Sequence, residues 1–288
     1  MNILISGAGG QIARALLACR PQGMSVTALT HHELDITDES AVRATVDRLA
    51  PDVIINGAAY TAVDRAESDM DAATRINADG PAYLASAAAH SGARLLHIST
   101  DFVFDGASSR PYRPDSSTSP LNIYGLTKRA GEERVLRILP ERAVVLRTAW
   151  IYAARGSNFL LTMLRLMRAH RKVRVVADQV GTPTAAHSVA ALLWRLVQQP
   201  DVGGIHHWTD AGVASWYDFA VAIAEEGAAC GLLPDEVEVI PITTAEYPTP
   251  ARRPAFSVLD KGSLAALGVT PVHWRENLRT VLREVEGA

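Results

Sequence analysis

Short apolar runs alternate with longer stretches of helical periodicity through the first half of the chain. The apolar runs predict five strands, over residues 2–6, 25–29, 53–56, 94–99 and 143–147. Apolar positions recurring every three or four residues predict helices between them, over residues 11–19, 39–49, 66–77, 81–90 and 124–139. Nearly continuous apolar strands that alternate with helices are typical of a parallel sheet covered on both faces. The pattern therefore predicts an α/β protein with a Rossmann-like, doubly wound sheet.

The rhythm loosens after about residue 150. Helical patterns appear over residues 159–170, 187–198, 216–229 and 274–285, and loops rich in proline and glycine separate them. We predict an NAD(P)-binding Rossmann domain over residues 1–150. Residues 151–288 are expected to form mainly a smaller, substrate-binding lobe, with some elements packing back on the first domain. A ligand cleft is expected between the two, at the carboxyl edge of the sheet.

Composition and charge narrow the class of protein. The 288 residues carry a formal net charge of −3 and no lysine or arginine run, which argues against a nucleic-acid partner. Cys19 and Cys230 are the only cysteines and form no CxxC motif, as expected for a reducing cytosol. The first residues, MNILISGAGG, lack the basic region of a signal peptide, and no apolar stretch is long enough to cross a membrane. The expected protein is cytoplasmic and independent of membranes.

A glycine-rich turn follows the first strand. In GAGGQIA, Gly7 and Gly10 stand in a GxxGxxA spacing, with Gln11 and Ile12 opening the next helix. Glycine at such a turn lets a pyrophosphate approach the positive end of the helix. Tight strand-to-helix turns also use glycine without binding anything, but the strand, loop and helix required by the motif are all predicted here. The turn therefore indicates a dinucleotide site.

Residues after the second and third strands indicate which dinucleotide the site binds and where it makes contact. NAD-specific sites usually place an acid at the end of the second strand, whereas Thr30 stands here with no carboxylate before Glu33. This favours NADPH, with NADH as the alternative. Further contacts are expected beside the adenine and at the middle of the dinucleotide, from Asp35, Ile36, Ala59, Tyr60 and Thr61. Asp35 also suits a plain turn.

Tyr124 and Lys128 lie four residues apart on a predicted helix, in LNIYGLTKRAGEE. This spacing places them on one face, one turn apart. Such pairs arise by chance on solvated faces. Alternatively, the ammonium group lowers the pKa of the tyrosine from about 10, so that the phenol exchanges a proton near neutral pH.

Together these segments resemble the extended short-chain dehydrogenase/reductase family. The resemblance covers nearly the whole chain and rests on GAGGQIA, ELDITD, PDVIINGAAYTAVDRAES, STDFVFDG, PLNIYGLTKRAGE, RTAWIY, DQVGTPT and YPTPARRPAFSVLD. It implies that the YxxxK pair, Tyr124 and Lys128, is catalytic together with Thr100. It also implies hydride transfer from NADPH to the C4 keto group of a dTDP-4-keto-6-deoxyhexose, first among them dTDP-4-dehydro-L-rhamnose. Thr100 and Tyr124 would bind the carbonyl oxygen, and Lys128 the nicotinamide ribose.

The resemblance also separates related activities. Dehydratases of the family carry Asp-Glu after the threonine, whereas Asp101 is followed here by Phe102, which argues against dehydration. Some relatives use a first-helix glutamate in a metal-linked dimer; Ala15 takes that place, so no metal is expected, while a homodimer stays open. Two other readings remain: a 4-ketoreductase of an antibiotic sugar, and a non-catalytic subunit like the regulatory subunit of methionine adenosyltransferase.

Substrate contacts are expected from four residues: Asp101, Trp150, Arg252 and Arg253. The aspartate would bind sugar hydroxyls, and the tryptophan matches an aromatic substrate contact of the family. The two arginines lie in a proline-framed loop and would pair with the diphosphate. A core role for the tryptophan and a surface role for the arginines are the alternatives.

Overall fold

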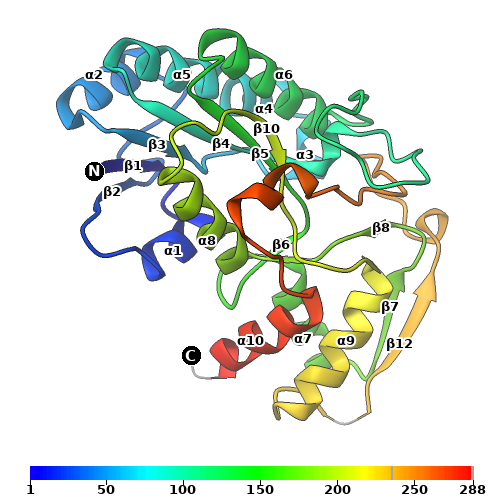
Figure 1. Cartoon of the computed structure of the whole chain (residues 1–288). Helices are drawn as coiled ribbons and strands as arrows, with labels where there is room; N and C mark the ends of the chain where they lie inside the picture. The colour runs from blue at the N-terminus through cyan, green and yellow to red at the C-terminus, as the bar shows by residue number, and fades with distance from the viewer. Residues whose placement is uncertain (235, 287–288) are drawn as a thin grey trace.

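A six-stranded parallel sheet forms the centre of the first lobe (Figure 1). The computed structural model describes residues 1–234 and 236–286; residues 235, 287 and 288 of the predicted second lobe lie outside the described residues. In spatial order the strands are β2 (Ser25–Leu29), β1 (Asn2–Ser6), β3 (Val53–Asn56), β4 (Arg94–Thr100), β5 (Ala143–Thr148) and β10 (Gly204–His207). The chain winds to one side after β1 and then to the other, so a topological switch point lies between β1 and β3. The predicted fold class is confirmed.

Helices cover both faces of this sheet, as the apolar strands require. One face carries α1 (Gln11–Ala18) and α8 (Ala186–Val197), which pack on alternate strand residues such as Ile3 and Ile5. The other face carries α2 (Glu39–Leu49), α5 (Gly80–Ser91) and α6 (Ile123–Ile138). Leu4, between the two isoleucines in sequence, packs on this second face. Alternate side chains of one strand thus pack into two separate cores, one on each face of the sheet.

The sixth strand comes from the second half of the chain. β10 pairs parallel with β5, and α8 packs against α1, where the Trp194 Nε1–H donates to the Leu16 carbonyl at 3.1 Å. The sequence pattern predicted the helix but not this strand, because GIHH carries too few apolar residues to stand out. Two elements beyond residue 150 therefore pack on the first lobe.

The helix predicted over residues 66–77 is divided. The structure has α3 (Val63–Ala66), α4 (Met70–Thr74) and a π-helical segment, Arg75–Asp79, that runs directly into α5. Asn77 lies in the π-helical segment, accepts from the Tyr60 N–H at 2.8 Å and donates to the Tyr60 carbonyl at 3.1 Å. A buried amide that binds another segment of backbone accounts for this bulge, which helical periodicity alone does not reveal.

The second lobe is built from three helices and small sheets. Its helices are α7 (Phe159–Ala169), α9 (Trp216–Ala229) and α10 (Trp274–Glu286). The strand pairs are β7 (Lys172–Val176) with β12 (Glu238–Ile242), β6 (Ile151–Tyr152) with β9 (Thr184–Ala185), and β8 (Val180–Gly181) with β11 (Ala214–Ser215). A separate aromatic and aliphatic core, centred on Phe219, holds them together. Among the described residues, no helix is both long and apolar enough to cross a membrane.

Candidate active site

The glycine turn lies at the switch point of the sheet. Gly7 adopts a φ of +78°, in the left-handed region, and a Cβ there would lie 2.6 Å from the Ala58 nitrogen. Only glycine fits this approach of two backbone segments. The turn places Gly10 at the start of α1, where it is the N-cap.

A cavity of about 600 Å³ runs along the carboxyl edge of the sheet from this turn. It brings together most of the predicted site residues: Gly10, Gln11, Ile12, Ala59, Thr61, Thr100, Asp101, Tyr124, Lys128, Trp150 and Arg253. We call this cavity the cleft. Residues from the ends of β1, β3, β4 and β5 meet there because carboxyl ends of parallel strands share one edge. The cleft does not include Gly7, Asp35, Ile36, Tyr60 or Arg252.

Three of these excluded residues have other contacts. Ile36 is buried in the core of α2 and α5, and its side chain leaves no room for a Cβ at Gly80. Asp35 accepts hydrogen bonds from the backbone and hydroxyl of Thr37, as in a plain turn. The Tyr60 hydroxyl donates to Asp69 at 3.1 Å.

The end of β2 differs from the expectation of an acid-free site. The Thr30 N–H and hydroxyl both donate to Glu33 Oε2 at 2.8 Å, and these bonds lower the pKa of Glu33. A tight turn thus folds the carboxylate back onto the strand end. The prediction considered only the order of residues along the chain and missed that the turn brings Glu33 back to Thr30.

The three predicted catalytic residues all line the cleft. Thr100 ends β4, and its hydroxyl accepts from the Phe102 N–H at 3.2 Å. Tyr124 lies in the first turn of α6, where a Cβ on Gly125 would overlap the Phe102 carbonyl. This glycine lets α6 approach the end of β4 closely. One turn later the Lys128 ammonium donates to the Ile98 carbonyl at 2.7 Å.

The acid strength of Tyr124 differs from the expectation. Burial raises the pKa of Tyr124 to about 12; the Thr100 hydroxyl lowers it, and the charge of Asp101 raises it further. No lowering by Lys128 appears, because the ammonium is directed to the Ile98 carbonyl and burial dominates. The phenol therefore stays protonated at neutral pH, which suits a proton donor.

Lys128 is itself buried, and burial lowers its pKa to about 8, opposed by the charge of Glu132. That carboxylate is buried one turn further along α6 and accepts from Arg147 Nη2 at 2.7 Å. A buried charge needs such a partner. The pair fixes α6 against β5 directly behind the cleft.

Asp101 is buried beside Thr100, whose hydroxyl donates to its Oδ1 at 3.1 Å. Burial raises the pKa of Asp101 to about 6, against the lowering effect of the Ser257 and Thr100 hydroxyls. Its other oxygen, Oδ2, has no hydrogen-bond partner among the described residues. Asp101 Oδ2 is thus a buried oxygen in the cleft that is available to a polar ligand.

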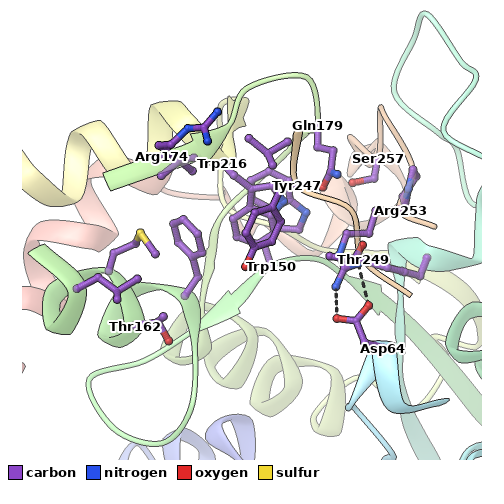
Figure 2. Close-up of a pocket in the computed structure, with 17 residues that line it drawn as sticks. Asp64, Trp150, Thr162, Arg174, Gln179, Trp216, Tyr247, Thr249, Arg253 and Ser257 are labelled. Atoms are coloured by element: carbon purple, nitrogen blue, oxygen red, sulfur yellow. Dashed lines mark hydrogen bonds and ion pairs between the residues drawn. The ribbon is translucent and has the colours of Figure 1, made fainter. Parts of the chain in front are cut away.

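A second cavity, of about 450 Å³, opens beside the cleft (Figure 2). We call it the side pocket. It shares Phe102, Trp150, Trp216 and Arg253 with the cleft. The other lining side chains include apolar, aromatic and polar groups that we did not single out from the sequence: Phe159, Met163, Leu166, Arg174, Gln179 and Tyr247. Two of them, Gln179 and Tyr247, belong to the DQVGTPT and YPTPARRP segments. The resemblance of these segments to the family was the sequence signal that could have identified them.

Trp150 forms the wall between the two cavities. Its φ of 51° lies in the left-handed region, which bulky residues rarely adopt. The indole stacks on Trp216 with ring centroids 3.5 Å apart, and a Cβ at Gly181 would lie 2.7 Å from the indole ring. The tryptophan therefore borders both cavities and is not a core residue of either lobe.

The two loop arginines separate in the structure. Arg253 reaches the junction of the cavities, where its Nη1 and Nη2 donate to Asp64 at 3.0 and 2.8 Å (Figure 2). Arg252 is exposed and lines neither cavity, although its carbonyl accepts from Asn122. Of the predicted pair, only Arg253 is placed to meet a ligand in both cavities.

No group of three potential metal ligands occurs among the residues that the structure describes. The family described as RmlD substrate binding domain matches residues 1–286. The chain belongs to this family.

Individual proteins are similar to the chain over nearly its whole length. The chain is 42% identical to dTDP-4-dehydrorhamnose reductase of Aggregatibacter actinomycetemcomitans, over 97% of this chain and 98% of that one. It is 41% identical to dTDP-4-keto-6-deoxy-D-glucose reductase of Streptomyces niveus, over 94% and 93%. The crystal structure of dTDP-4-dehydrorhamnose reductase from Bacillus anthracis in complex with NADP superposes with a TM-score of 0.92 at 34% identity, covering 98% of this chain and 99% of that one.

Proposed function

We propose that this chain uses NADPH to reduce the C4 keto group of a dTDP-4-keto-6-deoxyhexose, with dTDP-4-dehydro-L-rhamnose as the first candidate. The observation that carries the proposal is the position of Thr100, Tyr124 and Lys128. They lie in a cleft that begins at a glycine turn and opens into a side pocket. A dinucleotide and a nucleotide sugar would meet at these three side chains.

The cleft fits the cofactor. Gly10 and Gln11 at the start of α1 would hold the pyrophosphate, and the Lys128 ammonium would hold the nicotinamide ribose. The hydroxyls of Ser99 and Thr148 line the cleft and have no partner among the described residues, so they offer hydrogen bonds to a polar ligand. When bound, the reduced nicotinamide supplies the hydride; NADH is the alternative donor.

The protein supplies the proton. Negative charge grows on the carbonyl oxygen as the hydride arrives, and Thr100 and Tyr124 are proposed to hydrogen-bond that oxygen. The Tyr124 hydroxyl then donates its proton, which it retains at neutral pH because burial raises the pKa of Tyr124. Asp101 Oδ2 is proposed to accept from a sugar hydroxyl.

The side pocket suits the nucleotide half of the substrate. Phe159, Trp216 and Tyr247 line this pocket and provide aromatic surface for a base. Arg174 and Gln179 add polar side chains to the lining (Figure 2). Arg253, at the junction with the cleft, is proposed to bind the diphosphate between base and sugar. Trp150 would contact the sugar. A role for Arg252 in diphosphate binding then requires movement of an exposed side chain.

Two alternatives differ in a measurable way. An antibiotic-sugar 4-ketoreductase is supported by the similarity to the Streptomyces niveus enzyme, and it would prefer a D-configured 4-keto sugar. A non-catalytic subunit would bind NADPH without consuming it, which the complete set of Thr100, Tyr124 and Lys128 argues against. NADPH consumption with each 4-keto sugar, followed by NMR of the product, tests all three. Absence of turnover with every dTDP-4-keto sugar would overturn the proposal.

Location and assembly are also proposed. We place the enzyme in the cytoplasm because Cys19 and Cys230 are both free. A homodimer without a metal link is the proposed assembly, and light scattering of the purified protein measures it.

A further inference from the structure

Asn122 makes one contact more than a helix cap requires. It is the N-cap of α6, and its Oδ1 accepts from the Gly125 N–H at 2.8 Å. Its Nδ2 donates to the carbonyl of Arg252 at 2.7 Å, 130 residues away in sequence. One buried side chain therefore joins the helix of Tyr124 to the loop of Arg253.

Asn158 has the same arrangement at the other end of the cleft. It is the N-cap of α7 in the second lobe, and its Oδ1 accepts from the Leu161 N–H at 3.0 Å. Its Nδ2 donates to Gln11 Oε1 at 2.8 Å and to the Ala153 carbonyl at 2.9 Å. Gln11 begins α1 and lines the cleft. This contact joins the second lobe to the glycine turn.

Capping alone does not require asparagine at either position. An N-cap needs an acceptor oxygen, and asparagine, aspartate and serine cap about equally well. Asp38 caps α2, and Ser215 caps α9, with contacts confined to their own helices. The amide group at 122 and 158 adds an N–H donor, which an ionised aspartate lacks. The Ser215 hydroxyl also donates, but only to Asp218 in its own helix. In both asparagines the amide donor crosses to the other lobe.

We propose that Asn122 and Asn158 are positioning residues that hold the two lobes in register on either side of the cleft. Asn122 fixes the Arg253 loop relative to Tyr124, and so sets the distance between the diphosphate and the reacting carbon. Asn158 fixes α7 relative to Gln11, and so shapes the cofactor end. The ligand assignments rest on the proposed function; the contacts between the lobes do not.

Serine variants separate capping from joining, because serine retains the cap oxygen but is too short to reach the other lobe. In Asn122→Ser we expect dTDP affinity and kcat/KM for the nucleotide sugar to fall by about two- to tenfold, as for the loss of one neutral hydrogen bond. NADPH affinity should stay within about twofold of the parent. Asn122→Asp, which retains the cap and loses the donor, should show the same pattern.

Asn158→Ser should give the opposite pattern. NADPH affinity, measured by quenching of protein fluorescence, should fall by about two- to tenfold, because the lost contact is to Gln11 in the cleft. The dTDP affinity from calorimetry should fall less, because the retained cap holds the start of α7, which lines the side pocket. Asp38→Ser, a cap exchange in α2 outside both cavities, is the matched control. It should alter neither affinity and gives the change in Tm expected from exchanging a cap.

The outcomes distinguish this inference from the proposed function. A parent protein that binds NADPH and dTDP without turnover contradicts the proposed function but leaves both binding tests in force. If the two serine variants leave both affinities unchanged, or weaken both ligands equally, the asparagines are helix caps only and the inference is wrong. Crossed losses, larger for dTDP in the Asn122 variant and larger for NADPH in the Asn158 variant, support it.

Discussion

The cleft and the side pocket are built in different ways. The cleft follows the carboxyl edge of one parallel sheet, where the ends of neighbouring strands deliver its lining in a fixed order. The side pocket draws on α7, β7, α9 and the loop that carries Tyr247 and Arg253. Its walls are mainly side chains, and they come from segments far apart in sequence.

This difference has consequences for the effects of substitution. Backbone approach at Gly7 and the close packing of α6 at Gly125 define the cleft, so its shape depends on a few glycines and on the sheet. The side pocket depends on rings such as Trp150 and Trp216, stacked across a lobe boundary. We expect chemistry to be lost by changes in the cleft, and substrate affinity to be lost by changes in the side pocket.

The largest effect is expected from Tyr124→Phe. This change removes the proposed proton donor and should lower kcat by at least about 100-fold, the usual contribution of general acid catalysis. Affinities for NADPH and dTDP should stay near those of the parent, because the ring remains. NADPH absorbance follows turnover, and near-normal turnover would remove Tyr124 from the mechanism.

Arg253→Ala and Arg252→Ala test the side pocket as a matched pair. A charge-assisted hydrogen bond contributes about 1.5–3 kcal/mol, so loss of Arg253 should weaken dTDP binding by about one to two decades. Arg252 lines neither cavity, and its variant should bind within about twofold of the parent. Calorimetry with dTDP measures both; equal losses would show that the exposed arginine also reaches the diphosphate.

Activity should decline at alkaline pH. Burial lowers the pKa of Lys128 to about 8, so each pH unit above 8 should cost about tenfold in kcat/KM. Tyr124, with a pKa raised to about 12, keeps its proton in this range. Over the range from about pH 8 to about pH 10 the charged fraction of Lys128 should fall by about two decades. A pH profile that stays flat over this range would show that the ammonium charge is not needed.

Titration of Lys128 does not destabilise the fold at alkaline pH, so it does not lower activity through unfolding. The lowered pKa of Lys128 means that, above about pH 8, the folded state binds fewer protons at this site than the unfolded state. Its contribution to the free energy of unfolding therefore rises with pH until the unfolded lysine also loses its proton. Thermal unfolding measured across the same buffers is the control.

The smallest effect is expected from Glu33→Gln, which tests the cofactor end of the cleft. Replacing the carboxylate held by Thr30 removes a negative charge that would face the 2′-phosphate. NADPH affinity should rise a few-fold at low salt, while NADH affinity changes less. Identical changes for the two cofactors would show that this turn does not discriminate between them.

The sequence by itself determined five strands of the six-stranded sheet, the glycine turn and the candidate chemistry. Strands such as Asn2–Ser6 and Val53–Asn56 were predicted with the bounds that the structure has, because buried parallel strands are continuous apolar runs. Tyr124 and Lys128 were found because a four-residue spacing is a local feature, and Thr100 followed from the family resemblance. Their site at one edge follows from the parallel order of the strands.

Only the tertiary structure decided the features that depend on contacts between distant segments. The π-helical segment at Asn77, the sixth strand, the return of Glu33 to Thr30 and the pairing of Arg253 with Asp64 leave no periodic signal. The same holds for the acidity of Tyr124. Its spacing predicted a pKa lowered by Lys128, whereas burial raises the pKa, because desolvation depends on everything packed around the phenol and not on one neighbour along the helix.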